Sequence, residues 1–255
     1  MIIQIYEIQS PEDAQQMIDF GVDHIGSVIV SENHWKQPGI KATIDRVRLS
    51  SSRSSIIPLF NTPDTVFRAL EYYQPDIVQF CETIADHPDV ERRCLELVEL
   101  QSRIREQFSA VDIMRSIPIG VSGMSSPVPT LRIAEIFEPV SDYFLTDTLL
   151  MQHPGTQAFD EQPVNGFVGI TGQISDWNTA AELVASSRIP VILAGGISPD
   201  NVYDAIRRVR PAGVDSCTLT NAVDVNKKNI RFKKDPDKVI QLVREVRRAE
   251  KDMLK

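Results

Sequence analysis

Two glycine-rich segments hold the residues whose types and spacing best fit a chemical role. Gly169-Ile170-Thr171-Gly172 lies in a polar stretch, and Gly195-Gly196 directly follows the apolar run Val191 to Ala194. Backbone N–H groups in glycine loops at helix N-termini bind anions, because they direct partial positive charge at the ligand. The two segments therefore predict a phosphate-type anion site that includes Thr171, Gly172, Gly195 and Gly196.

Recurring phrases indicate which elements must position these loops. Three β-branched runs end in a hydroxyl residue, a proline and an acid, at Ser10-Pro11-Glu12, Thr62-Pro63-Asp64 and Ser198-Pro199-Asp200. This order supplies an N-cap, a first helical residue and a charge for the helix dipole, so each phrase predicts the start of a helix. A second phrase places an aspartate just before an apolar strand, at positions 23, 76, 142 and 215.

These joints divide the chain into a βαβα unit used about four times, which predicts an α/β fold with eight strands and eight helices. The 255 residues match the roughly 250 of a (βα)8 TIM barrel, so we expect one barrel domain over residues 1–255. The strands are expected at 2–6, 24–30, 56–60, 77–81, 117–121, 142–146, 190–194 and 214–218. Residues 165–170 are interpreted as part of a loop or hairpin that leads to the sixth helix. The glycine loops then lie at the C-terminal ends of the strands, where barrels of this type bind phosphate and substrate.

Composition narrows the classes of partner. The chain has 27 basic and 35 acidic residues, a formal charge of −8, which argues against nucleic-acid and anionic-membrane binding but allows a small anionic substrate. It has no long apolar run and no charged leader, so we expect neither a membrane span nor a secretory signal. The three scattered cysteines favour a reducing cytoplasm. Histidines and cysteines lack metal-ligand spacing, and we expect no metal or other cofactor.

Three further segments carry expectations. Residues 31–55 and 151–165 are the least regular parts of the chain, and they are candidate lids or ordinary surface loops. Residues 88–109 predict one long amphipathic helix, with apolar positions at Leu95, Val98, Ile104 and Phe108.

The chain resembles the phosphoribosylanthranilate isomerases of tryptophan biosynthesis. Residues 190–215 are similar to that family's AGG segment and the helix and strand after it, and FLTDT at 144–148 is similar to its strand-six LLD segment. GITGQISDW at 169–177 matches the family's GGTGKTFDW in length and in five residues. IYEIQSPEDA, GVDHIGSV, LFNTPDTV and PDIVQF follow the first four strands in order. The resemblance covers most of the chain and is weakest at 31–55 and 82–115.

The resemblance implies an Amadori rearrangement of a small phosphorylated sugar, in which an acid protonates the ribose ring oxygen and a base removes the C2 proton. The match at FLTDT makes Asp147 the general acid. A carboxyl group can do this near neutral pH only if desolvation or a neighbouring acid raises its pKa. The alternative is that Asp147 caps a helix or pairs with a loop arginine.

This sequence departs from the family at positions that face the substrate. Tyr6-Glu7 stands where the family has a Cys-Gly pair that carries the base, so Glu7 is the expected substitute, with Tyr6 and Cys81 as alternatives. Strand alternation points Glu7 away from the side of Tyr6 unless the strand ends or bulges there. Cys81 is also interpreted as a small buried hydrophobe.

The anion-binding positions are changed as well. Cys217-Thr218-Leu219 replaces the family's Ser-Ser-Gly, which leaves the Thr218 hydroxyl as a phosphate donor, and Asn221 replaces a glutamate. The arginine that holds the anthranilate carboxylate has no counterpart, and Lys36 or Lys41 is expected to reach instead.

Three hypotheses follow from these matches and departures. The first is an isomerase of this family with a changed base, acting as a monomer or homodimer. The second is a phosphosugar barrel with another reaction, of epimerase or lyase type. The third is a non-catalytic paralogue that binds a metabolite, which a cavity filled by Tyr6, Trp35 or Leu219 would favour.

Overall fold

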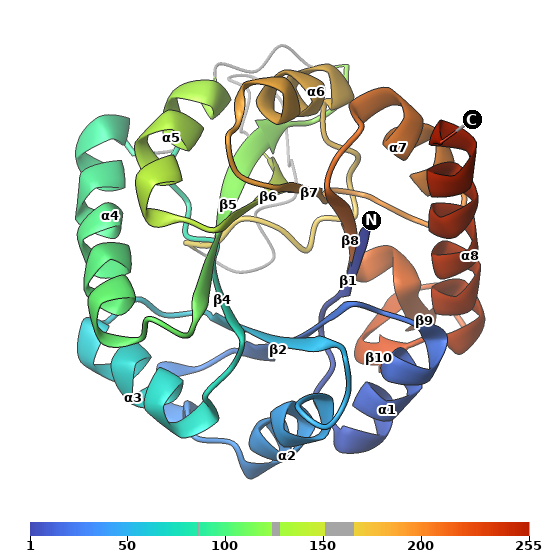
Figure 1. Cartoon of the computed structure of the whole chain (residues 1–255), viewed down its shortest axis with the longest axis horizontal. Coiled ribbons are helices and arrows are strands. Elements are labelled where there is room, and N and C mark those ends of the chain that lie inside the picture. The colour runs from blue at the N-terminus through green and yellow to red at the C-terminus, as the bar shows by residue number, and fades with distance from the viewer. Residues whose placement is uncertain (86, 124–127, 151–165, 255) are drawn as a thin grey trace.

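Eight parallel strands form a closed barrel in the computed structural model, and a ring of helices surrounds it (Figure 1). The structure describes residues 1–85, 87–123, 128–150 and 166–254. The strands follow one another in chain order around the barrel, and β1 (Ile2–Ile5) pairs in parallel with both β2 (His24–Ile29) and β8 (Gly213–Ser216), which closes it. The predicted (βα)8 barrel is confirmed.

The remaining elements alternate as the sequence predicts. The other barrel strands are β3 (Arg53–Pro58), β4 (Ile77–Phe80), β5 (Asp112–Gly120), β6 (Tyr143–Leu149) and β7 (Val191–Leu193). The helices are α1 (Pro11–Phe20), α2 (Pro38–Val47), α3 (Pro63–Tyr73), α4 (Val90–Gln107), α5 (Thr130–Phe137), α6 (Trp177–Ser186), α7 (Val202–Val209) and α8 (Pro236–Met253). No helix among the described residues is long and apolar enough to cross a membrane.

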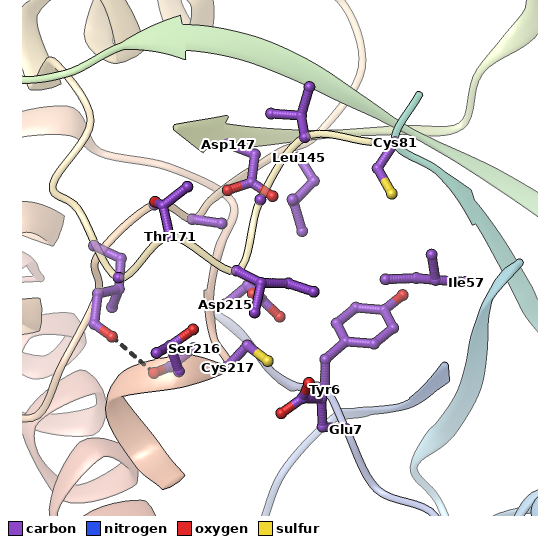
Figure 2. Close-up of a pocket in the computed structure, with 18 of the residues that line it drawn as sticks. Tyr6, Glu7, Ile57, Cys81, Leu145, Asp147, Thr171, Asp215, Ser216 and Cys217 are labelled. Carbon is purple, nitrogen blue, oxygen red and sulfur yellow. Dashed lines mark hydrogen bonds between the residues drawn. The ribbon is translucent and has the colours of Figure 1, made fainter. Parts of the chain in front are cut away.

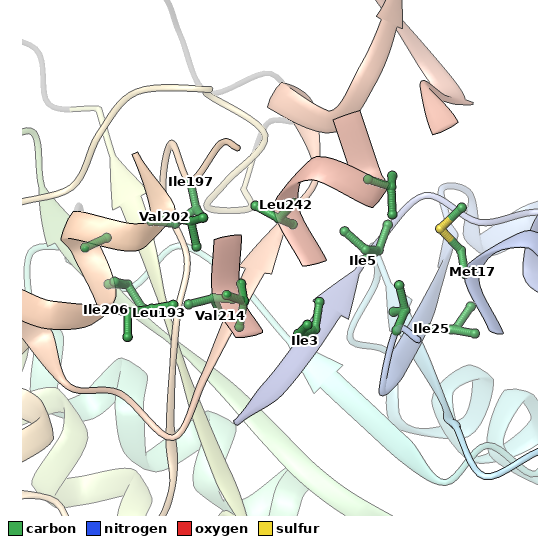
Figure 3. Packing of buried hydrophobic residues seen from close by; sticks show 14 of the residues in the cluster. Ile3, Ile5, Met17, Ile25, Leu193, Ile197, Val202, Ile206, Val214 and Leu242 are labelled. Carbon is green, nitrogen blue, oxygen red and sulfur yellow. The ribbon is translucent and has the colours of Figure 1, made fainter. Parts of the chain in front are cut away.

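Side chains between the sheet and the outer helices form the main apolar core (Figure 3). Ile3 and Ile5 on β1 and Val214 on β8 pack against helices α1, α7 and α8, which contribute Met17, Val202, Ile206 and Leu242. All of these side chains are buried. The outward-facing residues of the strands therefore pack against the helices, while the inward-facing residues line the barrel interior and the site.

The three predicted helix starts have different outcomes. Ser10 is a true N-cap, because its hydroxyl accepts a hydrogen bond from the Asp13 N–H at 3.1 Å. Thr62 occupies the N-cap position of α3, but its side chain makes no capping bond. The prediction at Ser198 is wrong, since residues 198–201 form a turn and α7 begins only at Val202. The Asn201 side chain accepts a hydrogen bond from the Ser198 N–H at 2.9 Å, which stabilises the turn in place of a first helical turn.

At three of the four predicted positions, an aspartate connects the segment before a strand to the neighbouring strand through a hydrogen bond. Asp23, Asp76 and Asp142 each accept a hydrogen bond from a backbone N–H at the start of the preceding strand, at 2.7 to 2.8 Å. Asp215 is different, because β8 begins two residues earlier at Gly213. Asp215 therefore lies inside its strand, in register with Gln4 of β1.

Segment 31–55 is not the irregular loop that the sequence predicts. It contains α2, whose buried residues Ile40, Thr43, Ile44 and Val47 have helical spacing, and β3 begins within it at Arg53. The serine-rich run 50–55 includes buried residues of a barrel strand rather than a flexible linker. The prediction of a lid at 31–55 is therefore wrong, and the other candidate lid, 151–165, lies outside the described residues.

Two strand boundaries and one helix face also differ from expectation. Strand β3 starts three residues before the predicted 56, and β5 starts five residues before the predicted 117. The predicted strand at 190–194 is confirmed, and the described residues 166–170 of the segment predicted as a loop or hairpin contain no barrel strand. Helix α4 is present, but Leu95 is 62% exposed, and the buried face is formed by Cys94, Leu97, Leu100, Gln101 and Ile104.

A short antiparallel hairpin between β8 and α8 was not expected. Its strands are β9 (Asn221–Val223) and β10 (Asn229–Lys234), which pair Val223 with Asn229 and Asn221 with Lys234. The hairpin follows directly from the C-terminal end of β8, so its side chains can reach the same end of the barrel as the glycine loops.

Candidate active site

One cavity opens at the C-terminal ends of the strands, and it brings all the predicted site residues together (Figure 2). Its walls come from the residues just after β1, from β2, β3, β4 and β6, from the loop after β6, and from the ends of β7 and β8. The seven predicted residues that line it are Glu7, Asp147, Thr171, Gly172, Gly195, Gly196 and Thr218. Segments more than 200 residues apart in the sequence therefore contribute to a single site.

Asp147 lies near the end of β6 and faces this cavity. Burial raises the pKa of its carboxyl group to about 7, although the Thr148 N–H, which donates to its Oδ1 at 2.9 Å, acts in the opposite direction. The loop that carries Gly169 lies against the carboxyl group, and a Cβ at Gly169 would be only 2.2 Å from Asp147 Oδ2. Asp147 is thus a carboxyl group that can hold a proton at neutral pH, as a general acid must.

Asp215 is a second carboxyl group in the same cavity, and the sequence analysis did not assign it to the site. Its side chain projects from β8, it is 7% exposed, and its Oδ1 has no hydrogen-bond partner among the described residues. Burial, and then the neighbouring charge of Asp147, raise the pKa of Asp215 to about 7. Figure 2 shows both carboxyl groups around the cavity. The site therefore holds two acids that titrate near neutrality and interact with each other.

Glu7 lines the cavity but is tied to the hairpin. Arg231 of β10 donates to its Oε1 at 2.7 Å, and Asn221 and the Phe232 N–H donate to its Oε2 at 3.1 and 3.3 Å. Burial acts to raise the pKa of Glu7, but the charge and hydrogen bond of Arg231 outweigh it, so the pKa is lowered. Glu7 has a left-handed backbone, with φ of 67°, which interrupts the strand alternation after Tyr6.

Tyr6 and Cys81, the alternative bases, are both buried in the cavity wall. The Tyr6 hydroxyl bonds to the Ser55 hydroxyl, and its ring packs so closely on Gly26 that a Cβ there would lie 2.2 Å from a ring carbon. Burial raises the pKa of the Tyr6 phenol and of the Cys81 thiol well above their ordinary values. Both groups stay protonated near neutral pH, so neither is suited to remove a proton.

The two glycine segments and the loop after β8 meet on one side of the cavity. A Cβ at Gly196 would lie 2.6 Å from the Ile174 N atom, and a Cβ at Gly172 would lie 3.5 Å from Thr218 Cγ2. Both glycines have a left-handed backbone, with φ of 66° and 67°. A side chain at Gly196 would collide with the backbone of the loop at Gln173 and Ile174, and the left-handed φ disfavours a side chain at Gly172. Both positions therefore present backbone, and the side chains of Thr171, Thr218 and Leu219 line the cavity beside them.

Lys36 and Lys41, which were expected to take the place of the family's carboxylate-binding arginine, do not line the cavity. Lys36 lies over the Tyr72 ring, 4.7 Å from its centroid, and Lys41 pairs with Asp45. No lysine or arginine of the described residues lines the cavity. The expectation for Lys36 and Lys41 is therefore wrong, because both side chains are held on the α2 and α3 side of the barrel.

The two tryptophans also lie outside the cavity lining. Trp177 is partly buried and packs on the main core, and Trp35 makes an edge contact with Tyr72. A cavity filled by Tyr6, Trp35 or Leu219 would favour the non-catalytic hypothesis; Tyr6 and Leu219 line the cavity, and Trp35 does not. Among the described residues there is no group of three or more His, Cys, Asp or Glu side chains that could hold a metal ion.

The site residues that the sequence reasoning missed are Asp215 and Arg231. The tripeptide Gly-Val-Asp occurs at 21–23 and again at 213–215. In the first copy Gly21 caps α1 and Asp23 lies before the strand, whereas in the second Gly213 is already in the strand. A signal was available in Pro211, which cannot continue a helix and directly follows Arg210, the left-handed C-cap of α7. Nothing in the sequence connects Arg231 with Glu7, which is 224 residues away.

Comparisons with known proteins agree with this architecture. A family model described as N-(5'-phosphoribosyl)anthranilate isomerase matches residues 131–244. The isomerase of Methanocella arvoryzae is 30% identical over 236 residues, which cover 90% of this chain and 93% of the relative. Isomerase 1 of Methanosarcina mazei is 28% identical and covers 97% of this chain and 95% of its own length.

Solved structures show the same fold. A crystal structure of phosphoribosyl anthranilate isomerase in complex with reduced 1-(o-carboxyphenylamino)-1-deoxyribulose 5-phosphate matches with a TM-score of 0.66 at 19% identity, over 97% of this chain and 99% of that chain. The Thermotoga maritima enzyme matches with a TM-score of 0.65 at 20% identity, over the same shares of the two chains. The sequence relatives carry the assignment: the chain belongs to the N-(5'-phosphoribosyl)anthranilate isomerase family.

Proposed function

We propose that this protein converts N-(5'-phosphoribosyl)anthranilate into 1-(o-carboxyphenylamino)-1-deoxyribulose 5-phosphate, the aldose-to-ketose isomerisation of tryptophan biosynthesis. The observation that carries the proposal is Asp147, a carboxyl group that faces the barrel cavity with a pKa raised by burial to about 7. Family membership gives the substrate class, and the cavity supplies the acid that the reaction needs.

Asp147 is the proposed general acid. Ring opening requires a proton on the ribose ring oxygen as the bond from that oxygen to C1 breaks, and a carboxyl group that is about half protonated near pH 7 can supply it. The backbone at Gly169 lies close against Asp147 Oδ2, where a side chain would collide with the carboxyl group. General acid catalysis of this kind contributes about 10² to 10⁴ in rate.

The phosphate group of the substrate is proposed to bind on the glycine surface. Thr171, Gly172, Gly195, Gly196 and Thr218 converge there from three loops. Backbone N–H groups and hydroxyls can bind a phosphate dianion, and preorganised donors lose little entropy when they do so. Leu219 also lines this part of the cavity, so the binding surface is partly apolar.

Glu7 stays a candidate for the base that removes the C2 proton, as the sequence predicts. It lines the cavity, but its carboxylate accepts hydrogen bonds from Arg231, Asn221 and the Phe232 N–H. A Glu7 base would have to leave the Arg231 ion pair to accept a proton, which lowers its basicity.

One observation favours a second candidate function. No cationic side chain of the described residues lines the cavity, so nothing in that lining pairs with an anthranilate carboxylate. A phosphosugar that lacks this carboxylate would lose no binding interaction with the cavity lining. The second candidate is therefore a barrel that acts on another phosphosugar, with the same phosphate site and the same acid.

The test is turnover of freshly generated phosphoribosylanthranilate by the purified protein, followed through the loss of anthranilate fluorescence. We expect turnover by the unaltered protein and a decrease of at least 10²-fold in Asp147→Asn. Asp147→Asn should still bind the reduced product analogue, which separates loss of chemistry from loss of the site. Binding of the analogue without turnover by the unaltered protein would refute the isomerase and favour the second candidate.

A further inference from the structure

Removal of the C2 proton needs a base that is ionised near neutral pH and free to accept a proton. Three of the groups around the cavity fail one of these conditions. The Tyr6 phenol and the Cys81 thiol are held protonated by burial, which raises the pKa of each. The Glu7 carboxylate is ionised but occupied by three donors. Asp215 is the remaining carboxylate in the cavity lining.

The geometry of Asp215 leaves one of its carboxyl oxygens free to accept a proton. Its strand neighbour in the barrel is Gln4, so its side chain lies on the inner surface of the sheet and lines the same cavity as Asp147. It is 93% buried, and its Oδ1 has no hydrogen-bond partner within the described residues. A buried carboxylate oxygen without a partner is costly, and such atoms are concentrated at functional sites.

From this geometry we infer, on the basis of the proposed isomerase function, that Asp215 is the general base and that Asp147 and Asp215 act as a carboxyl–carboxylate pair. Glu7 then holds the hairpin through Arg231 and shapes the cavity rim instead of accepting the proton. The base is then a residue of β8, the eighth strand, and not a residue at the end of β1, the first strand.

The proton balance of the reaction fits such a pair. Asp147 gives its proton to the ring oxygen as the C1–O bond breaks, which leaves a C1=N iminium ion. Asp215 takes the C2 proton, and the C2–H electrons form a C1=C2 bond while the iminium electrons return to nitrogen. Ketonisation then adds a proton to C1 and removes one from the C2 hydroxyl. Asp215 supplies the first and Asp147 accepts the second, so both groups return to their starting states.

The charges around Asp215 favour one shared proton on the pair at neutral pH. Burial and then Asp147 raise the pKa of Asp215 to about 7, while a hydrogen bond with the Gln4 side chain and then the charge of Lys234 act in the opposite direction. Tyr6 and Cys217 are the other titratable groups that interact with it, and burial raises the pKa of each, so both are neutral in this range. Two interacting carboxyl groups that share a proton provide one acid and one base at the same pH.

The experiment compares Asp215→Asn with Glu7→Gln, a matched pair of carboxylate-to-amide changes in one cavity. Turnover of phosphoribosylanthranilate and binding of the reduced product analogue are measured for each. We expect Asp215→Asn to lose at least 10²-fold in kcat with analogue affinity within about threefold, and Glu7→Gln to lose less than about tenfold. Asp215→Ala should regain turnover when formate is added, because a small carboxylate can occupy the vacated space.

Each outcome decides the inference. A loss of 10² or more in Glu7→Gln with near-normal turnover in Asp215→Asn would assign the base to Glu7 and overturn it, while leaving the isomerase intact. Loss in Asp215→Asn without rescue of Asp215→Ala by formate, and with impaired analogue binding, would make Asp215 structural and also overturn it. Absence of turnover in the unaltered protein is a failure of the proposed function itself.

Discussion

Replacing Asp215 by asparagine should make the stability of the protein less sensitive to alkaline pH. In the folded protein burial and Asp147 raise the pKa of Asp215 from the ordinary 3.8 to about 7. Between these two values the folded state binds more protons than the unfolded chain, so the free energy of unfolding falls as the pH rises from about 4 to about 7. Because asparagine does not titrate, this decrease in the free energy of unfolding is absent from the variant.

The size of the effect follows from the pKa difference. A rise of about three units corresponds to about 4 kcal/mol, because one unit is worth about 1.4 kcal/mol. Part of that range lies below pH 4.5, so about 3 kcal/mol should be lost between pH 4.5 and pH 8. Since Asp215 is 7% exposed, solvent screening removes little of it.

Urea unfolding of the wild type and of Asp215→Asn at pH 4.5 and pH 8 measures this. The stability difference between the two proteins should shift by about 3 kcal/mol in favour of the variant at the higher pH. Any constant cost of the amide group cancels, because it is present at both pH values. A difference that is the same at both pH values would show that Asp215 is already ionised at pH 4.5 and would refute the reasoning.

Two further substitutions test the hairpin and the acid. Arg231→Gln should destabilise the protein by about 1 to 2 kcal/mol, less than a fully buried pair because Arg231 is 38% exposed, and urea unfolding measures it. The pKa of Glu7 is lowered in the folded state, so the stability that Glu7 contributes above its unfolded pKa is lost on acidification. Arg231→Gln should weaken this pH dependence of the free energy of unfolding. A pH dependence equal to that of the wild type would contradict the assigned ion pair. Gly169→Ala should reduce turnover at least tenfold, because its Cβ would displace the Asp147 carboxyl group and φ at Gly169 is 113°. Turnover equal to wild type would mean that this loop does not fix Asp147.

The fold could be predicted because its signals are local. Hydroxyl caps, apolar runs and the joint aspartates repeat along the chain, and each depends on residues within one turn or one strand. Helix α2 was missed because its buried positions, Ile40 and Ile44 among them, lie beside a serine-rich run that suggested a loop. The hairpin β9–β10 was missed because its strands are short and largely polar.

The candidate site could be predicted only in part. The glycine loops and Asp147 follow strands, so the barrel pattern alone places them at one end. The role of Asp215 depends on its register in the barrel, and the closing pair of β8 with β1, which sets Asp215 beside Gln4, fixes that register. The state of Glu7 depends on Arg231, which arrives from the far end of the chain. Both are tertiary effects that no local pattern encodes.

The most direct test of the account is the pH dependence of kcat/KM for phosphoribosylanthranilate, after non-enzymatic loss of the substrate is subtracted. This profile reports the ionisation of groups in the free enzyme. Because the pKa values of Asp147 and Asp215 are both about 7, the account predicts a bell-shaped curve with its maximum near pH 7. A rate that stays level from pH 7 down to pH 5 would contradict it, since that profile requires a base whose pKa is lowered, as that of Glu7 is.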